Sequence, residues 1–550
     1  MAIETSADVA EQLERALIRW RGEWPMLPAV IRLDSKLVGR PKDMTKRELS
    51  IDEGRGFVWG RIPLDDLIRY YLANREDPSG KEYVDLGTPI WAASTTAGSS
   101  ATITNLLAQT PSPGAASVGA ALVDLGVTPT AGTTAVPRTF GGKLRHVSYP
   151  PGTGIDLSGH AEDVLEVLLD RLSATHGGKN MLPQTTVSMA LIDNPAPDTV
   201  QLAKDCFDQH CAPEMLDAVK AINLLLDGDT LADGTQMPAV VNMSVGTHVG
   251  PHNGQSPLEA YISGSVFKRN LRFPFAAAGN EGLQALSARL ELKRDEVDYM
   301  RLIATEKCTE LLVEFWWDDA AGPADIEINV TTEASGMAKS FIPIKSGSAG
   351  STLVASAVGR RRSATFLTLC QSQQHGTMSC IAFAVTRPAV PPGQAPLPEL
   401  RISFDIVAKS SDVAIHAWTV ICDKERKSYF TRGGPDGTVS VPASDPMVVS
   451  VAAFDPISKQ MWRDSSRGPA SRYNSGASIE SPMMAHLSNS LNGRDGTSFA
   501  SPRAAADATV SLANSTTRKN CTEAKKLVEA TYGTIAPAFD PRYGFIKQTS

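Results

Sequence analysis

The chain has 550 residues, a length that favours two to four domains over one. Its hydrophobic content of 42% and charged content of 21% are typical of a globular protein with a large core. The net charge of −7 argues against a nucleic-acid partner or an anionic membrane surface, both of which attract basic proteins.

The first residues and the cysteines favour a cytoplasmic protein. Residues 1–8 carry acidic side chains and lack the basic-then-apolar order of a signal peptide. No stretch reaches the roughly 18 apolar residues of a membrane-spanning helix. The 7 cysteines are scattered without CxxC spacing, which favours reduced thiols over disulfides or a zinc site. We therefore expect no membrane partner and no cofactor, with a structural calcium ion left as an alternative that no residue pattern indicates.

Residues 1–92 have a pattern of their own. Apolar side chains recur at helical spacing over residues 7–20, and a second helix is predicted over 63–74 with proline in its first turn. The stretch 94–114 is rich in Ser, Thr, Ala, Gly and Pro and is predicted to be a linker or surface loop. We expect a small N-terminal α+β region over 1–92.

From about residue 118 the chain alternates buried strands with helices. We predict strands at 119–123, 186–192, 239–244 and 273–279, and helices at 161–174 and 211–226. This alternation predicts an α/β fold, a parallel sheet with helices on both faces. Over 295–435 short alternating strands separated by turns predict an antiparallel β-sandwich or jelly-roll insertion. The α/β pattern then returns, so we predict an N-terminal region over 1–92 and one α/β domain in two parts, 93–294 and 436–550, interrupted by the insertion at 295–435.

A tight turn followed by an alanine-rich helix carries the first chemical signal. Residues 493–498 (GRDGTS) form the turn, and residues 499–510 form the helix. A serine at a helix start is exposed beside free backbone N–H groups that can bind an oxyanion, but its hydroxyl needs a neighbouring base. Taken alone, the segment also fits an ordinary capped helix. GTSFASP (496–502) resembles the nucleophile motif of the subtilisin family, Gly-Thr-Ser-x-Ala-Ser-Pro, and this resemblance implies that Ser498 is a nucleophile.

An acid and a base precede Ser498 in the chain order Asp, His, Ser that subtilisin shows. Asp124 lies in the run ALVDLGV, similar to the family's strand ending in Asp-x-Gly-Val, which implies that its carboxylate orients the histidine. A turn-capping Asp is the alternative. His160 opens a helix, as the family's histidine does, although Ala-Glu follows it in place of Gly-Thr. His176, at the end of the same helix, is the rival base, and the position at the helix start favours His160.

The segment FAAAGNEG (275–282) resembles the family's Ala-Ala-Gly-Asn-Glu-Gly, in which the asparagine amide donates to the oxyanion. The resemblance implies this role for Asn280, whereas the isolated segment also fits a turn. Two stretches are similar to the family edges that pair with an extended peptide substrate. The substrate-binding residues implied are Ser244, Val245, Gly246, Ala278, Gly279 and Thr497.

The resemblance covers roughly 118–290 and 436–550 and implies a subtilisin-like fold. It implies a serine endopeptidase that hydrolyses proteins or peptides through an acyl-enzyme. The insertion falls between the asparagine and serine motifs, and we expect it to brace the enzyme rather than bind a ligand. The alternative function is a weak or inactive subtilase-like scaffold that binds a protein partner. Residues 1–92 are either a retained domain or a propeptide, and the oligomeric state is open.

Overall fold

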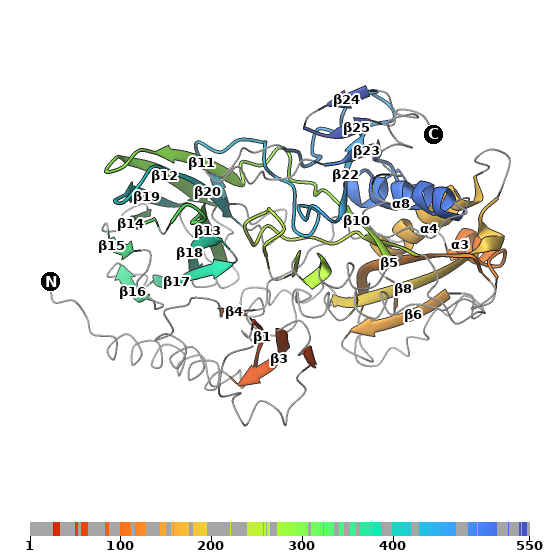
Figure 1. Cartoon of the computed structure of the whole chain (residues 1–550), viewed down its shortest axis with the longest axis horizontal. Helices are drawn as coiled ribbons and strands as arrows, with labels where there is room; N and C mark the ends of the chain where they lie inside the picture. Colours follow the sequence, from red (N-terminus) through yellow and green to blue (C-terminus); the bar gives the residue numbers. More distant parts are fainter. Residues whose placement is uncertain are drawn as a thin grey trace, which may run out of the picture.

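The structure is a computed structural model of the whole chain (Figure 1). It describes residues 26–32, 50–52, 57–63, 83–86, 100–111, 116–127, 144–149, 156–157, 159–174, 180–194, 221, 239–256, 258–259, 261–263, 272–305, 310–322, 324–334, 340–345, 352–358, 364–375, 377–386, 399–419, 428–468, 482–491, 493–513, 526, 538–540 and 542–546.

A 10-stranded sheet forms the centre of the α/β part. Its order is β24-β25-β23-β22-β10-β9-β5-β8-β6, with β7 paired to β5 off this path. Neighbours from β25 through β6 are parallel, whereas β24 and β7 pair antiparallel. The strands are β5 (Val118–Val127), β6 (Leu144–Tyr149), β7 (Asp156–Leu157), β8 (Thr185–Asn194), β9 (Ala239–Met243), β10 (Arg272–Ala277), β22 (Val449–Phe454), β23 (Met484–Leu487), β24 (Ala538–Asp540) and β25 (Gly544–Ile546). The 3-10 helix η3 (Leu182–Gln184) leads into β8.

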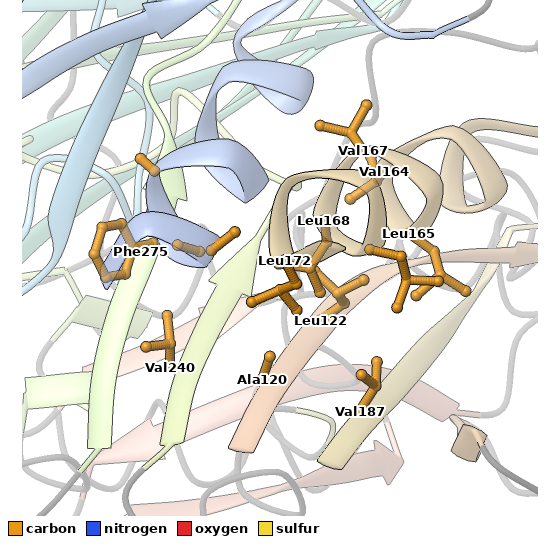
Figure 2. Close-up of a cluster of buried hydrophobic side chains, with 14 of the residues drawn as sticks. Ala120, Leu122, Val164, Leu165, Val167, Leu168, Leu172, Val187, Val240 and Phe275 are labelled. Atoms are coloured by element: carbon orange, nitrogen blue, oxygen red, sulfur yellow. The ribbon is translucent and has the colours of Figure 1, made fainter. Parts of the chain in front are cut away.

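Three helices pack together over one face of this sheet. They are α3 (Ser100–Leu107), α4 (Gly159–Ser173) and α8 (Thr497–Ala513). Figure 2 shows Leu168 of α4 directed toward Leu122 of β5, and both are buried in one cluster with residues of α3 and α8. The predicted α4 and α8 are therefore confirmed, and their apolar faces hold them against the sheet.

The other face of the sheet is covered as well. Successive side chains of a strand point to opposite faces, and the alternate residues Ala121 and Val123 of β5 belong to a separate buried cluster. That cluster includes Leu258 and Tyr261 from a helical segment. Both faces are thus buried, which confirms the α/β class predicted from the sequence.

The insertion is a sandwich of two antiparallel sheets (Figure 1). Phe315 and Phe404, one from each sheet, meet edge to face at a centroid distance of 4.8 Å inside its core. The six-stranded sheet contains β11 (Ser287–Leu292), β20 (Val413–Thr419), β13 (Glu310–Asp318), β18 (Met378–Thr386), β17 (Ala364–His375) and β16 (Thr352–Val358), in that order. The five-stranded sheet contains β15 (Ser340–Lys345), β14 (Ile326–Ala334), β19 (Leu400–Ala408), β12 (Val297–Ala304) and β21 (Ser428–Phe430), in that order.

The N-terminal region contributes a separate four-stranded antiparallel sheet in the order β2-β3-β1-β4. Its strands are β1 (Met26–Arg32), β2 (Ser50–Asp52), β3 (Phe57–Pro63) and β4 (Tyr83–Leu86). Pro63, predicted to begin a helix, ends β3 instead. The predicted helix 7–20, the rest of the helix 63–74, and residues 211–226 apart from the helical Ala221 lie outside the described residues.

Two further local predictions are corrected by the structure. The supposed linker 94–114 contains α3, because Ile103 and Leu107, four residues apart, are fully buried against α4. This tertiary contact outweighs the weak helix propensity of the surrounding Ser and Thr residues. The strand predicted to stop at residue 123 continues as β5 to Val127, pairing with β8 along its length. Asp124 therefore lies within the strand rather than after it.

Candidate active site

His160 and Asp124 form a buried pair. Asp124 lies on β5 and His160 is the second residue of α4, and their exposed fractions are 0% and 1%. Nδ1 of His160 lies 2.8 Å from Oδ1 of Asp124. Since an ionised carboxylate only accepts hydrogen bonds, Nδ1 carries the proton in this contact and Nε2 presents a lone pair. Asp124 on β5 thus holds the imidazole in the tautomer that a general base requires.

The second ring nitrogen of His160, Nε2, is buried and makes no hydrogen bond among the described residues. Neither Nε2 of His160 nor Oδ2 of Asp124 makes a hydrogen bond to any residue that the structure describes. The imidazole ring packs on Phe499 at a centroid distance of 5.7 Å, next to Ser498 in the chain. Buried polar atoms are nearly always hydrogen-bonded, so an unsatisfied ring nitrogen on a histidine that packs on Phe499 requires an explanation.

Ser498 lies in the first turn of α8, and the helix start is built around its carbonyl. Pro502 has no N–H to donate to the carbonyl four residues earlier, which is that of Ser498. The hydroxyl of Ser244 donates to this oxygen instead, at 3.0 Å. Asn242 at the end of β9 completes the link, donating to Ser244 Oγ at 2.9 Å and accepting from Ser501 Oγ at 2.5 Å. The proline of the motif and the polar end of β9 together fix the position of the serine.

Asn280 lies against the residue before the serine. Its Oδ1 accepts from both the N–H and the hydroxyl of Thr497, each at 2.9 Å. The Thr497 hydroxyl in turn accepts the N–H of Gly279 at 3.1 Å. Two donors on Oδ1 fix the orientation of the amide and leave Nδ2 as its donor end. A Cβ built on Gly496 would lie 3.6 Å from Nδ2, which places this donor over the turn before Ser498.

The six residues expected to bind substrate differ in exposure. Gly246 and Gly279 are partly exposed, whereas Ser244, Val245, Ala278 and Thr497 are buried. A Cβ on Gly246 would lie 2.6 Å from Ser440 Oγ, and Gly279 has a φ of 114°. Within these two segments, the backbone at Gly246 and Gly279 is therefore the part that is accessible for hydrogen bonds to a peptide. Their substrate contacts stay predictions.

An ion pair that the sequence analysis did not identify joins the two helix starts. Asp163, one turn after His160, lies 3.0 Å from the guanidinium of Arg494, which precedes Ser498 by four residues. Their side chains are 0% and 14% exposed. In the sequence, each of the two residues lies close to a motif, and this proximity was the one indication of a role. A contact between residues so far apart in the sequence cannot be derived from local spacing. His176, the rival base, lies outside the described residues.

Neither a metal-binding cluster nor a membrane-spanning helix is found among the described residues. Among the described residues, no group of three or more His, Cys, Asp or Glu side chains could hold a metal ion. None of the described helices is both long enough and apolar enough to cross a membrane. The expected absence of a cofactor stays a prediction.

Comparisons with known proteins assign the chain to a family. The model of the subtilase family matches residues 214–545, a range that contains Asn280 and Ser498 and begins after Asp124 and His160. No curated protein sequence gives a significant match. The chain is similar in fold to the CspB protease of Clostridium perfringens, with a TM-score of 0.56 and 16% identity over 79% of this chain and 92% of that one. The epidermin leader peptide processing serine protease EpiP of Staphylococcus aureus matches at a TM-score of 0.42 and 12% identity, over 96% of this chain and 99% of that one. Because the family model spans more than half of its residues, the chain belongs to the subtilase family.

Proposed function

We propose that the protein is a serine endopeptidase with Ser498 as its nucleophile. Ser498 Oγ would attack the peptide carbonyl while Nε2 of His160 takes its proton, and the same imidazole would then protonate the leaving amine. Asp124 would orient the imidazole and stabilise its charged form. Water would hydrolyse the acyl-enzyme by the same proton transfers in reverse.

The observation that carries this proposal is the buried pair of Asp124 and His160 with its free Nε2. Buried ring nitrogens are usually hydrogen-bonded, and a general base needs one lone pair available, so the unsatisfied Nε2 of a histidine at 1% exposure fits that role. A hydrogen bond from Ser498 Oγ to Nε2 is not formed, and such bonds are often long before substrate binds.

Asn280 and the start of α8 supply the electrostatic part of the proposed mechanism. With Oδ1 held by Thr497, the Nδ2 group of Asn280 would be the donor for the oxyanion, together with the backbone N–H of Ser498. The N–H groups of Thr497, Phe499 and Ala500 already donate to other acceptors. The partly exposed backbone at Gly246 and Gly279 would pair with an extended peptide. Protein or peptide substrates follow from this arrangement.

A fluorophosphonate probe tests the proposal directly. We expect the full-length protein to be labelled on Ser498, with loss of labelling in Ser498→Ala and a strong reduction in His160→Ala. Wild-type protein that shows no labelling while its thermal unfolding is cooperative would refute the peptidase.

An absence of labelling in the folded wild-type protein would favour the scaffold hypothesis. The missing Ser498–His160 hydrogen bond is the observation in its favour, since a binding scaffold needs no such contact.

N-terminal sequencing of the purified protein separates the two roles of residues 1–92: a mature start near residue 93 indicates a removed propeptide. Fractionation of cells tests the expected cytoplasmic location.

A further inference from the structure

The backbone of Asn280 is fixed by the side chain that follows it. Oε2 of Glu281 accepts the N–H of Asn280 at 2.7 Å. Thr497 holds the side-chain oxygen of the same asparagine. Asn280 is therefore restrained at both ends, by the nucleophile helix at its amide and by Glu281 at its backbone.

One carboxylate oxygen of Glu281 collects all of these contacts. His248 Nε2 lies 3.3 Å from Oε2, and the Ser466 hydroxyl donates to it at 3.4 Å. Burial alone would raise the pKa of the Glu281 carboxyl, but the hydrogen bond and charge of His248, the Asn280 N–H and Ser466 lower this pKa below its ordinary value. Glu281 thus acts as an ionised acceptor. A Cβ on Gly279 would lie 2.7 Å from Oε2, so the close approach depends on glycine there.

His248 is itself fixed from the insertion. Its ring stacks on His252 at a centroid distance of 5.8 Å, and His252 stacks on Trp418 of β20 at 4.4 Å. Burial and the neighbouring His248 lower the pKa of His252 to about 3, so this ring is neutral and stacks without a charge to solvate. We call His248, His252 and Trp418 the histidine bridge.

A second contact from the insertion holds the loop between the two histidines. The N–H of Gly250 donates to Oε2 of Glu314 on β13 at 2.7 Å, and the indole N–H of Trp316 donates to the same oxygen at 2.9 Å. Trp316 and Trp418 are each 1% exposed. The loop that carries His248 is thus packed between the insertion and the segment 279–281.

From these contacts we infer that Glu281, held by His248, is a positioning residue for oxyanion stabilisation by Asn280. The inference rests on the proposed function and deepens it. A donor aimed at a developing charge is effective only at the correct position, and a displacement of about 1 Å costs up to about 10²-fold in rate. Glu281 does not need to touch the substrate for this effect, because it acts through the Asn280 backbone.

A double-mutant cycle with Asn280 tests the inference. Glu281→Ala and Glu281→Gln are prepared in the wild-type and in the Asn280→Ala full-length proteins, and kcat and KM are measured on a peptide selected from a cleavage library. Glu291→Ala is the matched control, since this carboxylate lies on β11 with a side chain 72% exposed. Thermal unfolding of each variant verifies folding. If Glu281→Ala does not fold, His248→Ala carries the same cycle.

We expect Glu281→Ala to lower kcat about 10- to 100-fold with KM changed less than about 3-fold. Glu281→Gln keeps an acceptor for the Asn280 N–H and should recover most of kcat. In the Asn280→Ala background, Glu281→Ala should change kcat less than about 2-fold, because the group that it positions is gone. Glu291→Ala should match the wild type.

Three results would overturn the inference. An equal loss of kcat in both backgrounds would indicate a general structural role for Glu281. A rise in KM at constant kcat would indicate a substrate contact, and an unchanged Glu281→Ala would remove any role. Failure of the proposed function is distinguishable from all three, because the wild type itself would then show no Ser498-dependent hydrolysis or labelling.

Discussion

Arg494→Met removes the guanidinium that lies 3.0 Å from the Asp163 carboxylate and keeps most of the aliphatic side chain. This ion pair connects the start of α4, which carries His160, to the turn before Ser498. At an effective dielectric constant of about 20, two unit charges at this separation attract by about 5 kcal/mol, and most of this offsets the cost of burying them. The ion pair therefore contributes little net free energy to folding, whereas removal of only one partner has a large cost.

The two single substitutions should differ because the two side chains differ in exposure. Without Arg494, the Asp163 carboxylate stays at a site with 0% exposure, and loss of one member of a buried pair costs about 3–5 kcal/mol. Without Asp163, a guanidinium that is already 14% exposed can turn toward water, so Asp163→Leu should cost only about 1–2 kcal/mol. The double variant replaces the pair by apolar groups and should recover most of the loss from Arg494→Met.

Thermal unfolding and the rate of fluorophosphonate labelling measure these effects. A chain of this length need not unfold in two states, so midpoints rather than free energies are compared. We expect Arg494→Met to have the lowest midpoint and to label about 10-fold more slowly, with recovery of both in Asp163→Leu/Arg494→Met. Arg463→Met is the control, since that side chain is 80% exposed. Equal and additive losses from the two single variants would contradict the argument from burial.

Two further predictions concern a glycine beside the site and a buried carboxyl in the insertion. Gly282→Ala should impair folding and labelling severely, because its Cβ would lie 2.1 Å from the backbone oxygen of Ser465. Gly322→Ala has nothing within 4 Å and should show only the backbone strain of its φ of 127°, about 1–3 kcal/mol. Equal unfolding midpoints for the two variants would contradict this. Burial raises the pKa of Glu314 to about 7 despite the opposing donors from Gly250 and Trp316, so between pH 4.5 and 7 the folded protein holds a proton that the unfolded chain releases. This stabilisation, about 3 kcal/mol, is complete below pH 4.5 and lost as the pH rises through 7, and Glu314→Gln should therefore show a flatter fall of the unfolding midpoint from pH 5 to 7.5. Parallel curves for the two proteins would show that Glu314 does not titrate in this range.

Local motifs made a large part of this structure predictable. The strand that leads to Asp124, the helix near His160 and the helix after Ser498 each follow from apolar spacing and turn residues within about fifteen positions. The antiparallel sheets of the sandwich followed from alternation in the same way, although its first strand, β11, begins before the predicted range 295–435. Three local predictions were wrong: Pro63 ends a strand, β5 continues past residue 123, and the segment 94–114 contains α3. In α3, burial of two side chains against α4 decided the conformation and the composition of the segment did not.

The contacts that tune the site were not predictable, because they join residues far apart in the sequence. The sheet face of the insertion shows why. Along β13 and β20, Val313, Phe315 and Ala417 face the core of the sandwich, while Glu314, Trp316 and Trp418 face the other way and are also buried. When both faces of a strand are apolar, the sequence predicts that each face packs against another part of the protein. It does not show which part of the protein covers the second face. Only the three-dimensional structure shows that this surface meets the loop 246–256, and that a glutamate inside an inserted sandwich therefore contributes to the position of His248 beside Glu281.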